Sequence, residues 1–221
     1  MTSLPDPATH HPETHHPETH RAKRRREAYL AIHQAAYHHA IVRGHSAVTV
    51  EAIAADAGVS PRTFFNYFPT KDDAIIGIRP PCLTEGDCAV LTAHPHTPLL
   101  ERTAHLLIHV IRSTIVDLDT FVTRKEHLAS HPELRSRLNR HVHHCELTIT
   151  DALAAGDTLV GASEMDQLAA TGPNATRALT ALAGAVVRHA FTQDPTILTS
   201  DPTGQVAVSL TTIKQIVNLP A

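Results

Sequence analysis

Four polar side chains lie close together in a short segment that could contact nucleic acid. They are Arg62, Thr63, Asn66 and Tyr67. Arg and Asn can form hydrogen bonds with base edges in the major groove of DNA, and hydroxyl groups can bind phosphates. Phe64 and Phe68 are four residues apart, so in a helix both would face the core. No acidic residue occurs between Gly58 and Lys71. The segment favours a DNA-facing helix over an ordinary amphipathic surface helix.

The residues around this segment fit a helix-turn-helix. Thr49 and Ser60 are good N-caps, because their hydroxyls can accept hydrogen bonds from the free N–H groups at a helix start. Gly58 can end the first helix in a left-handed conformation, and Pro61 suits the first position of the second helix. The sequence therefore predicts one short helix after Thr49 and another over residues 60–67, joined by a tight turn.

Over about residues 21–78 the chain resembles the DNA-binding domain of TetR/AcrR-type transcriptional regulators. The matching residues are Thr49, Val50, Ile53, Ala54, Lys71 and the segments 57–60 and 63–68. The resemblance implies an all-α protein with an N-terminal three-helix domain and a C-terminal helical domain for ligand binding and dimerisation. It also implies a homodimeric repressor that binds double-stranded operator DNA and is released by a small-molecule effector. Phe65 departs from the family, which often has a tyrosine there.

We expect the DNA contacts to come from the helix-turn-helix and from a basic run at residues 21–26. This run precedes a predicted helix over 22–43, which should end at Gly44, and it could bind the DNA backbone or minor groove. The alternative is a solvated, charged helix end. The expected contact residues are Arg24, Arg25, Thr49, Ser60, Pro61, Arg62, Thr63, Phe65, Asn66, Tyr67 and Lys71. Arg62 would read a base edge, and Lys71 would bind a phosphate at the start of a helix that reaches Ile78.

Charge is divided unevenly along the chain. Residues 21–79 contain nine basic and five acidic residues, whereas residues 80–221 contain ten basic and fourteen acidic ones. A cationic block on an acidic chain suits phosphate binding. The three cysteines form neither an even disulfide framework nor a metal-ligand spacing, which is typical of a reducing cytoplasm. No apolar run reaches the ~18 residues of a membrane span, so no membrane association is expected.

These patterns divide the chain into three segments. Residues 1–20 contain the His-His-Pro-Glu-Thr sequence twice and are expected to form a disordered His/Pro-rich tail. Residues 21–79 should form the helix-turn-helix domain, and residues 80–221 the effector-binding and dimerisation domain, with an interruption at Pro80. Helices are predicted in the third segment around 88–93, over 98–120, 121–130 and 133–155, within 157–172, and over 174–192 and 204–219.

The predicted helix over 174–192 carries small and apolar residues on more than one face. Such a helix must be covered on more than one side. Together with the helix over 204–219, it could form a four-helix interface with a second copy of the chain. The alternative is a helix inside the core of one subunit.

The effector is expected to bind between the helices of residues 99–155. The candidate lining residues are His105, His109, Arg112, Phe121, His141 and Cys145. Arg112 could meet an anionic group or pair with Asp117 or Glu146. Histidines four apart, such as His105 and His109, could also bind zinc, so a metal-responsive regulator is an alternative. Histidine is frequent throughout the chain, so composition explains these spacings, and no metal or cofactor is expected. The absence of catalytic motifs argues against an enzyme.

Overall fold

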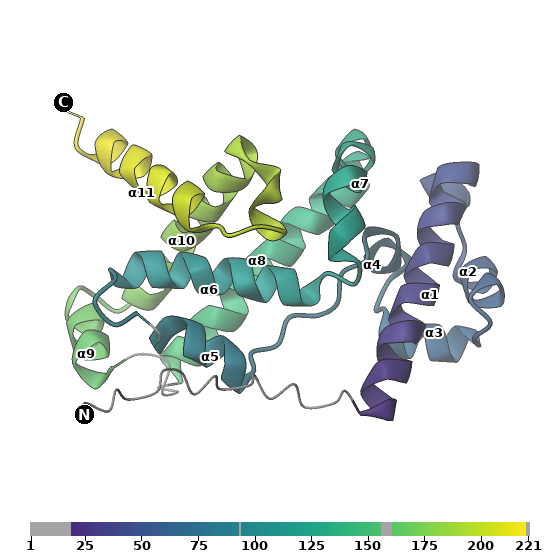
Figure 1. Ribbon diagram of the computed structural model, residues 1–221, viewed down its shortest axis with the longest axis horizontal. Coiled ribbons are helices and arrows are strands. Elements are labelled where there is room, and N and C mark those ends of the chain that lie inside the picture. Colours follow the sequence, from purple (N-terminus) through teal and green to yellow (C-terminus); the bar gives the residue numbers. More distant parts are fainter. Residues whose placement is uncertain (1–18, 93, 156–160, 220–221) are drawn as a thin grey trace, which may run out of the picture.

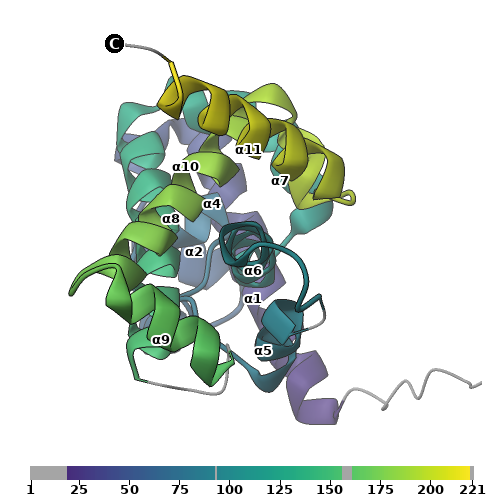
Figure 2. The same cartoon turned by 90° about the vertical axis from the view of Figure 1, so that its left-hand side faces the viewer.

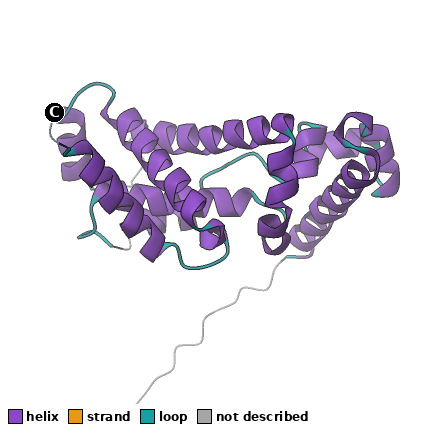
Figure 3. Cartoon of the chain, turned by 90° about the horizontal axis from the view of Figure 1, so that it is seen from above, coloured by secondary structure: helices purple, strands orange, loops and turns teal. Residues whose placement is uncertain are grey.

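The computed structural model describes residues 19–92, 94–155 and 161–219. The α-helices are α1 (His20–Arg43), α2 (Val50–Asp56), α3 (Pro61–Tyr67), α4 (Lys71–Ile76), α5 (Glu85–Thr92), α6 (Leu99–Thr114), α7 (Leu118–Ser130), α8 (Pro132–Ala154), α9 (Ala162–Ala170), α10 (Ala175–Gln193) and α11 (Thr203–Val217). Two short 3₁₀ helices, η1 (His45–Ala47) and η2 (Pro195–Leu198), were not predicted. Within the described residues there is no strand, which confirms the all-α prediction (Figure 3).

The helices α1 to α3 lie at one end of the molecule, and α10 and α11 lie toward the other (Figure 1). In the C-terminal part, α6 is surrounded by α5, α8, α10 and α11 (Figure 2). The inner face of α10 packs in this core through Leu179, Ala183, Val186, Val187 and Ala190. No helix in the described segments is long and apolar enough to cross a membrane.

The helix-turn-helix forms as the sequence predicts. The hydroxyl of Thr49 accepts a hydrogen bond from Ala52 N at the start of α2 (3.2 Å). Gly58 has a φ of 67°, the left-handed conformation in which a side chain would be strained. Phe64 and Phe68 are both fully buried, so the apolar face of α3 is anchored in the core of the N-terminal helices.

The helix that begins at Lys71 is shorter than predicted. We expected it to reach Ile78, but α4 ends at Ile76 and Gly77 follows with a φ of 79°. The Gly77 N–H donates to the carbonyl oxygen of Asp73 (2.8 Å). The ring of His33 lies so close to Gly77 that an added Cβ would be 2.8 Å from it. Gly77 thus ends the helix and also allows α1 to pack closely against α4.

The prediction of one helix over 98–120 is wrong, because α6 ends at Thr114. Ile115 instead forms an isolated antiparallel bridge with Ile78. The main chain closes two hydrogen bonds there, from Arg79 N to Thr114 O (2.9 Å) and from Val116 N to Gly77 O (2.8 Å). The pairing satisfies backbone groups that the two helix ends leave open. It joins the segment after α4 to the end of α6.

The N-terminal boundary also differs from the prediction. His20, which we placed in the tail, is the first residue of α1, and Thr19 is its N-cap, since the Thr19 hydroxyl accepts a hydrogen bond from Ala22 N (3.3 Å). The prediction of disorder for the rest of the tail concerns residues outside those that the structure describes. The other predicted helices of the C-terminal part correspond to α5 and α7 to α11, with shifted ends.

Candidate nucleic-acid interface

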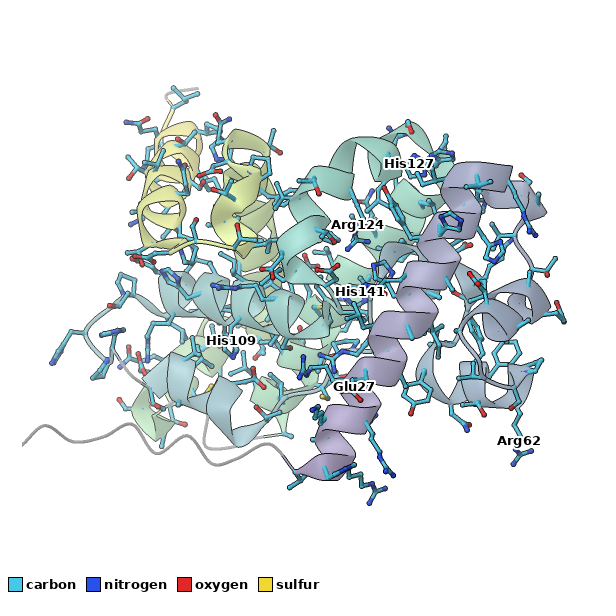
Figure 4. The ribbon with its side chains drawn as sticks, turned by 45° about the vertical axis from the view of Figure 1, so that its right-hand side comes forward. Glu27, Arg62, His109, Arg124, His127 and His141 are labelled. Carbon is cyan, nitrogen blue, oxygen red and sulfur yellow. The ribbon has the colours of Figure 1, made fainter. Side chains whose placement is uncertain are left out.

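The outer face of α3 carries the predicted contact residues. Arg62 is exposed and points away from the other helices (Figure 4). Asn66 is exposed as well, and Phe65 has 56% of its surface accessible. Pro61 occupies the first helical position, and Ser60 Oγ accepts a hydrogen bond from Thr63 N (3.0 Å). These residues therefore present a polar surface with one large aromatic ring toward solvent.

The basic start of α1 lies beside this face. A groove of about 880 Å³ is formed between the two helices. It is lined by Thr19, His20, Arg21, Ala22, Arg24, Arg25, Thr63, Asn66 and Tyr67. The structure therefore brings five predicted contact residues together: Arg24, Arg25, Thr63, Asn66 and Tyr67. Three arginines along one groove, with amide and hydroxyl groups opposite, are suited to a phosphate backbone.

Tyr29 on α1 holds α3 in place. Its ring meets Tyr67 edge-on, with ring centroids 4.8 Å apart, and meets Phe68 at 5.3 Å in the same manner. The guanidinium carbon of Arg25 lies 5.7 Å from the Tyr29 ring centroid. A hydrogen bond to Tyr29 raises the pKa of Arg25, which keeps this group cationic. Tyr29 is not among the predicted site residues, although its position four residues after Arg25 places both on one helix face.

Lys71 has a structural contact in addition to its predicted role. Its ammonium group donates to the carbonyl oxygens of His45 (3.3 Å) and Val48 (3.1 Å) and is partly buried. These contacts hold the turn between α1 and α2 against the start of α4. A phosphate contact by Lys71 remains a prediction, and so do the other individual DNA contacts.

The six residues expected to line an effector pocket differ in exposure, and an effector site at these residues remains a prediction. His141, Cys145 and Phe121 are buried in the core. His141 is hydrogen-bonded to Thr114 (2.8 Å), and its Nε2 lies 3.8 Å from Cys145 Sγ. Burial lowers the pKa of His141 to about 4 and raises that of Cys145 to about 12. Both groups are therefore neutral at neutral pH, which suits a packing role better than ligand binding.

The other three candidates lie along α6. His105 is half-buried, and burial lowers its pKa. His109 has about half of its side chain exposed, and its Nε2 lies 3.1 Å from Asp87 Oδ1. Arg112 pairs with neither predicted carboxylate, and its Nη1 lies 3.5 Å from the carbonyl oxygen of Ser200. Glu146 instead pairs with Arg188 (2.6 Å) and His143 (3.1 Å).

The histidine clusters do not form a metal site in the described part of the chain. No three His, Cys, Asp or Glu side chains come together there in a way that could hold an ion. The rings of His127 and His131 are close, with centroids 4.4 Å apart, but they stand next to Tyr37 rather than next to further ligands.

Residues 32–75 match the family model described as bacterial regulatory proteins, tetR family. This segment is a TetR-family domain. The match runs from the middle of α1 to α4 and includes both helices of the helix-turn-helix. This match supports a DNA-binding transcriptional regulator. No curated protein matches the chain.

Proposed function

We propose that this TetR-family regulator is a homodimeric repressor, which leaves its operator when a small molecule binds. The observation that carries the proposal is the position of Arg62 and Asn66 on an exposed helix face, beside the arginines that begin α1. We assign residues 21–79 to DNA binding and residues 80–221 to effector binding and dimerisation. Arg62 would read a base edge, and the surrounding hydroxyl, amide and basic groups would bind phosphates.

Exposed apolar side chains on α10 and α11 support dimerisation. Leu182, Val208, Ile216 and Val217 expose between 47% and 75% of their surface. They lie on the two helices at the end of the molecule opposite to α1–α3 (Figure 1). Packing these helices against a second copy would cover the apolar surface and leave both α3 helices free. Two-fold symmetry would then present two α3 helices to half-sites ~34–36 Å apart on one face of DNA.

Contacts between the two parts of the chain provide a route from effector to DNA. Arg137 on α8 forms an ion pair with the buried Asp73 of α4 (2.6 Å). His45, in the turn after α1, lies 3.1 Å from Glu133 of α8 and 2.8 Å from Asp72 of α4. A ligand that shifts α8 would therefore also shift α4 and the helix-turn-helix. The spacing of the two α3 helices would change, and their fit to the operator would be lost.

A footprint on the DNA upstream of the coding sequence tests the proposal. We expect the purified protein to protect two half-sites about one helical turn, ~10 base pairs, apart. Sedimentation of the same sample should give the mass of two chains. A monomer that protects no upstream sequence would contradict both the dimer and the operator.

A further inference from the structure

A cavity of about 790 Å³ lies at the junction of the two parts of the chain. We call it the junction cavity. Its walls come from α1, from the end of α3, from the segment after α4, from α5 and from the last two turns of α6. Of the six residues predicted to line an effector pocket, the junction cavity contains His109 and none of the others. Its volume lies within the ~300–1,000 Å³ of sites that bind drug-sized molecules.

Two arginines in this wall, Arg25 and Arg79, have no acidic partner among the described residues. Arg79 donates from Nη2 to the carbonyl oxygen of Ser113, while its buried Nε has no acceptor among the described residues. The guanidinium carbons of Arg79 and Arg25 lie 5.3 and 5.7 Å from the centroid of the Tyr29 ring. In the described part of the chain neither arginine forms an ion pair with a carboxylate. A partly buried guanidinium with a free donor favours an anionic ligand.

The remaining wall combines apolar surface with one carboxylate, Asp87, which already has hydrogen-bonding partners. Phe65, Ile115 and Val116 contribute aromatic and aliphatic groups. Asp87 accepts hydrogen bonds from the N–H and hydroxyl of Thr84, both at 2.6 Å, and pairs with His109 at 3.1 Å. Its charge is therefore directed to these groups rather than to the arginines. A ligand that satisfies the whole cavity has an anionic head and an apolar or aromatic body.

We propose that the junction cavity binds an amphipathic organic anion, which competes with DNA for the same side chains. Arg25, Asn66 and Tyr67 line both the junction cavity and the groove between α1 and α3. An anion held by Arg25 and Arg79 would draw Arg25 away from the DNA backbone and fill the space behind Tyr67. The competition rests on the proposed DNA-binding function, whereas the binding of the anion does not depend on it.

Anilinonaphthalene sulfonate, an aromatic anion whose fluorescence rises in apolar surroundings, is a suitable probe for the full-length protein. Its uncharged parent, phenylnaphthylamine, has the same rings without the sulfonate. We expect Arg79→Gln to weaken binding of the sulfonate by about tenfold or more, because a charge-assisted hydrogen bond is lost. Phenylnaphthylamine should bind both proteins alike. The matched control is Arg140→Gln, an exposed arginine of α8, which should change neither affinity.

Equal sulfonate binding by the wild type and Arg79→Gln would overturn the proposal, as would an equal loss for the two dyes. Circular dichroism checks that Arg79→Gln is folded. If it is not, Cys82→Trp decides the matter, because Cys82 is exposed and lines the junction cavity. Its larger ring should fill the cavity and weaken both dyes by about tenfold. Unchanged sulfonate binding by Cys82→Trp would overturn the proposal.

Duplex DNA binding separates this inference from the proposed function. The sulfonate should lower the DNA affinity of the wild type, while Arg79→Gln should keep its DNA affinity within about twofold and resist the sulfonate. A wild type that binds the sulfonate but no DNA would contradict the proposed function and leave the site intact. A wild type that binds both at once would contradict the competition. If Arg79→Gln lost as much DNA affinity as Arg24→Gln, the cavity would be a binding site for a DNA phosphate, and the proposal would fail.

Discussion

Arg124 on α7 hydrogen-bonds to the main chain of Ile76, the last residue of α4. Its Nη1 donates to the Ile76 carbonyl oxygen at 3.2 Å, and its Nη2 donates to the carbonyl oxygen of Asp117 at 3.1 Å. The guanidinium carbon also lies 5.2 Å from the ring centroid of Tyr37 on α1. Figure 4 shows Arg124 between α7 and α1. One buried cation therefore links the C-terminal helices to the DNA-binding part.

Replacing Arg124 with methionine should lower the free energy of unfolding by about 2–5 kcal/mol, because buried carbonyl oxygens lose a charged donor. Urea denaturation followed by circular dichroism measures this change. The control is Arg135→Met, an exposed arginine of α8, which should change stability by less than about 0.5 kcal/mol. Equal stabilities of the two variants would show that Arg124 does not tie the parts together.

Gly184 on α10 should not tolerate alanine. An added Cβ would be 1.9 Å from Glu146 Oε1, so this carboxylate would have to move away from its contact with Arg188. We expect Gly184→Ala to cost about 1–3 kcal/mol of stability. Gly204 lies in the first turn of α11 with open space around its Cα, so Gly204→Ala should stabilise the protein by up to about 1 kcal/mol. Thermal unfolding of both variants tests this difference in sign.

Stability should fall as the pH is lowered from 6.5 toward 4. Burial lowers the pKa of both His33 and His141 from 6.5 to about 4. Because these pKa values are lower in the folded state, each neutral imidazole stabilises the fold above pH 6.5, and this contribution is lost as the pH approaches 4. Each should add ~1.4 kcal/mol per pH unit to the slope of unfolding free energy within this window.

The variants His33→Asn and His141→Gln keep an amide near the hydrogen-bonding ring nitrogen but cannot titrate. Each should reduce the slope by ~1.4 kcal/mol per pH unit relative to the wild type. Other groups titrate in the same range, so the difference between variant and wild type is the quantity to measure. Parallel slopes for all three proteins would refute the role of the buried imidazoles.

Two substitutions distinguish base reading from phosphate binding. Arg62→Ala should lower operator affinity by ~1–3 kcal/mol and relax the preference at one base pair. Lys71→Ala should weaken binding to all sequences alike and reduce the salt slope by about one. The Lys71 ammonium also donates hydrogen bonds to the carbonyl oxygens of His45 and Val48. The stability of the Lys71→Ala variant must therefore be measured together with its DNA affinity. An equal loss on operator and random DNA for Arg62→Ala would exclude base reading.

A charged side chain on the apolar face of α10 and α11 should weaken the proposed dimer. Leu182→Lys should raise the dimer dissociation constant by about tenfold or more, because a lysine would be desolvated at the interface. Sedimentation at several concentrations measures this constant. Val42→Lys introduces the same charge at an exposed apolar position of α1 and should leave dimerisation unchanged. Equal dissociation constants for both variants would place the interface elsewhere.

Local signals in the sequence were sufficient for the helix-turn-helix. The caps at Thr49 and Ser60, the turn at Gly58 and the buried pair of phenylalanines each depend on a few neighbouring residues, and the structure contains all of them. Pro80 predicts a later end for α4 than the structure has, although Gly77 offers a left-handed end three residues earlier.

Features that depend on distant segments could not be predicted. Ile115 continues the apolar pattern of α6 but leaves the helix to pair with Ile78, and no local pattern encodes a partner 37 positions away. The candidate effector residues share a helical spacing, which indicates a common face but not which helix covers it. The spacing therefore does not predict that His141 and Cys145 are buried in the core.

The edge-on contact between Tyr29 and Tyr67 has a spectroscopic consequence. The chain contains three tyrosines and no tryptophan. Tyr29 and Tyr37 belong to α1 and Tyr67 to α3, so the tyrosine emission of the unlabelled protein originates in the N-terminal helices. The molecule thus carries a built-in optical reporter of this one region, and it is silent about the remainder.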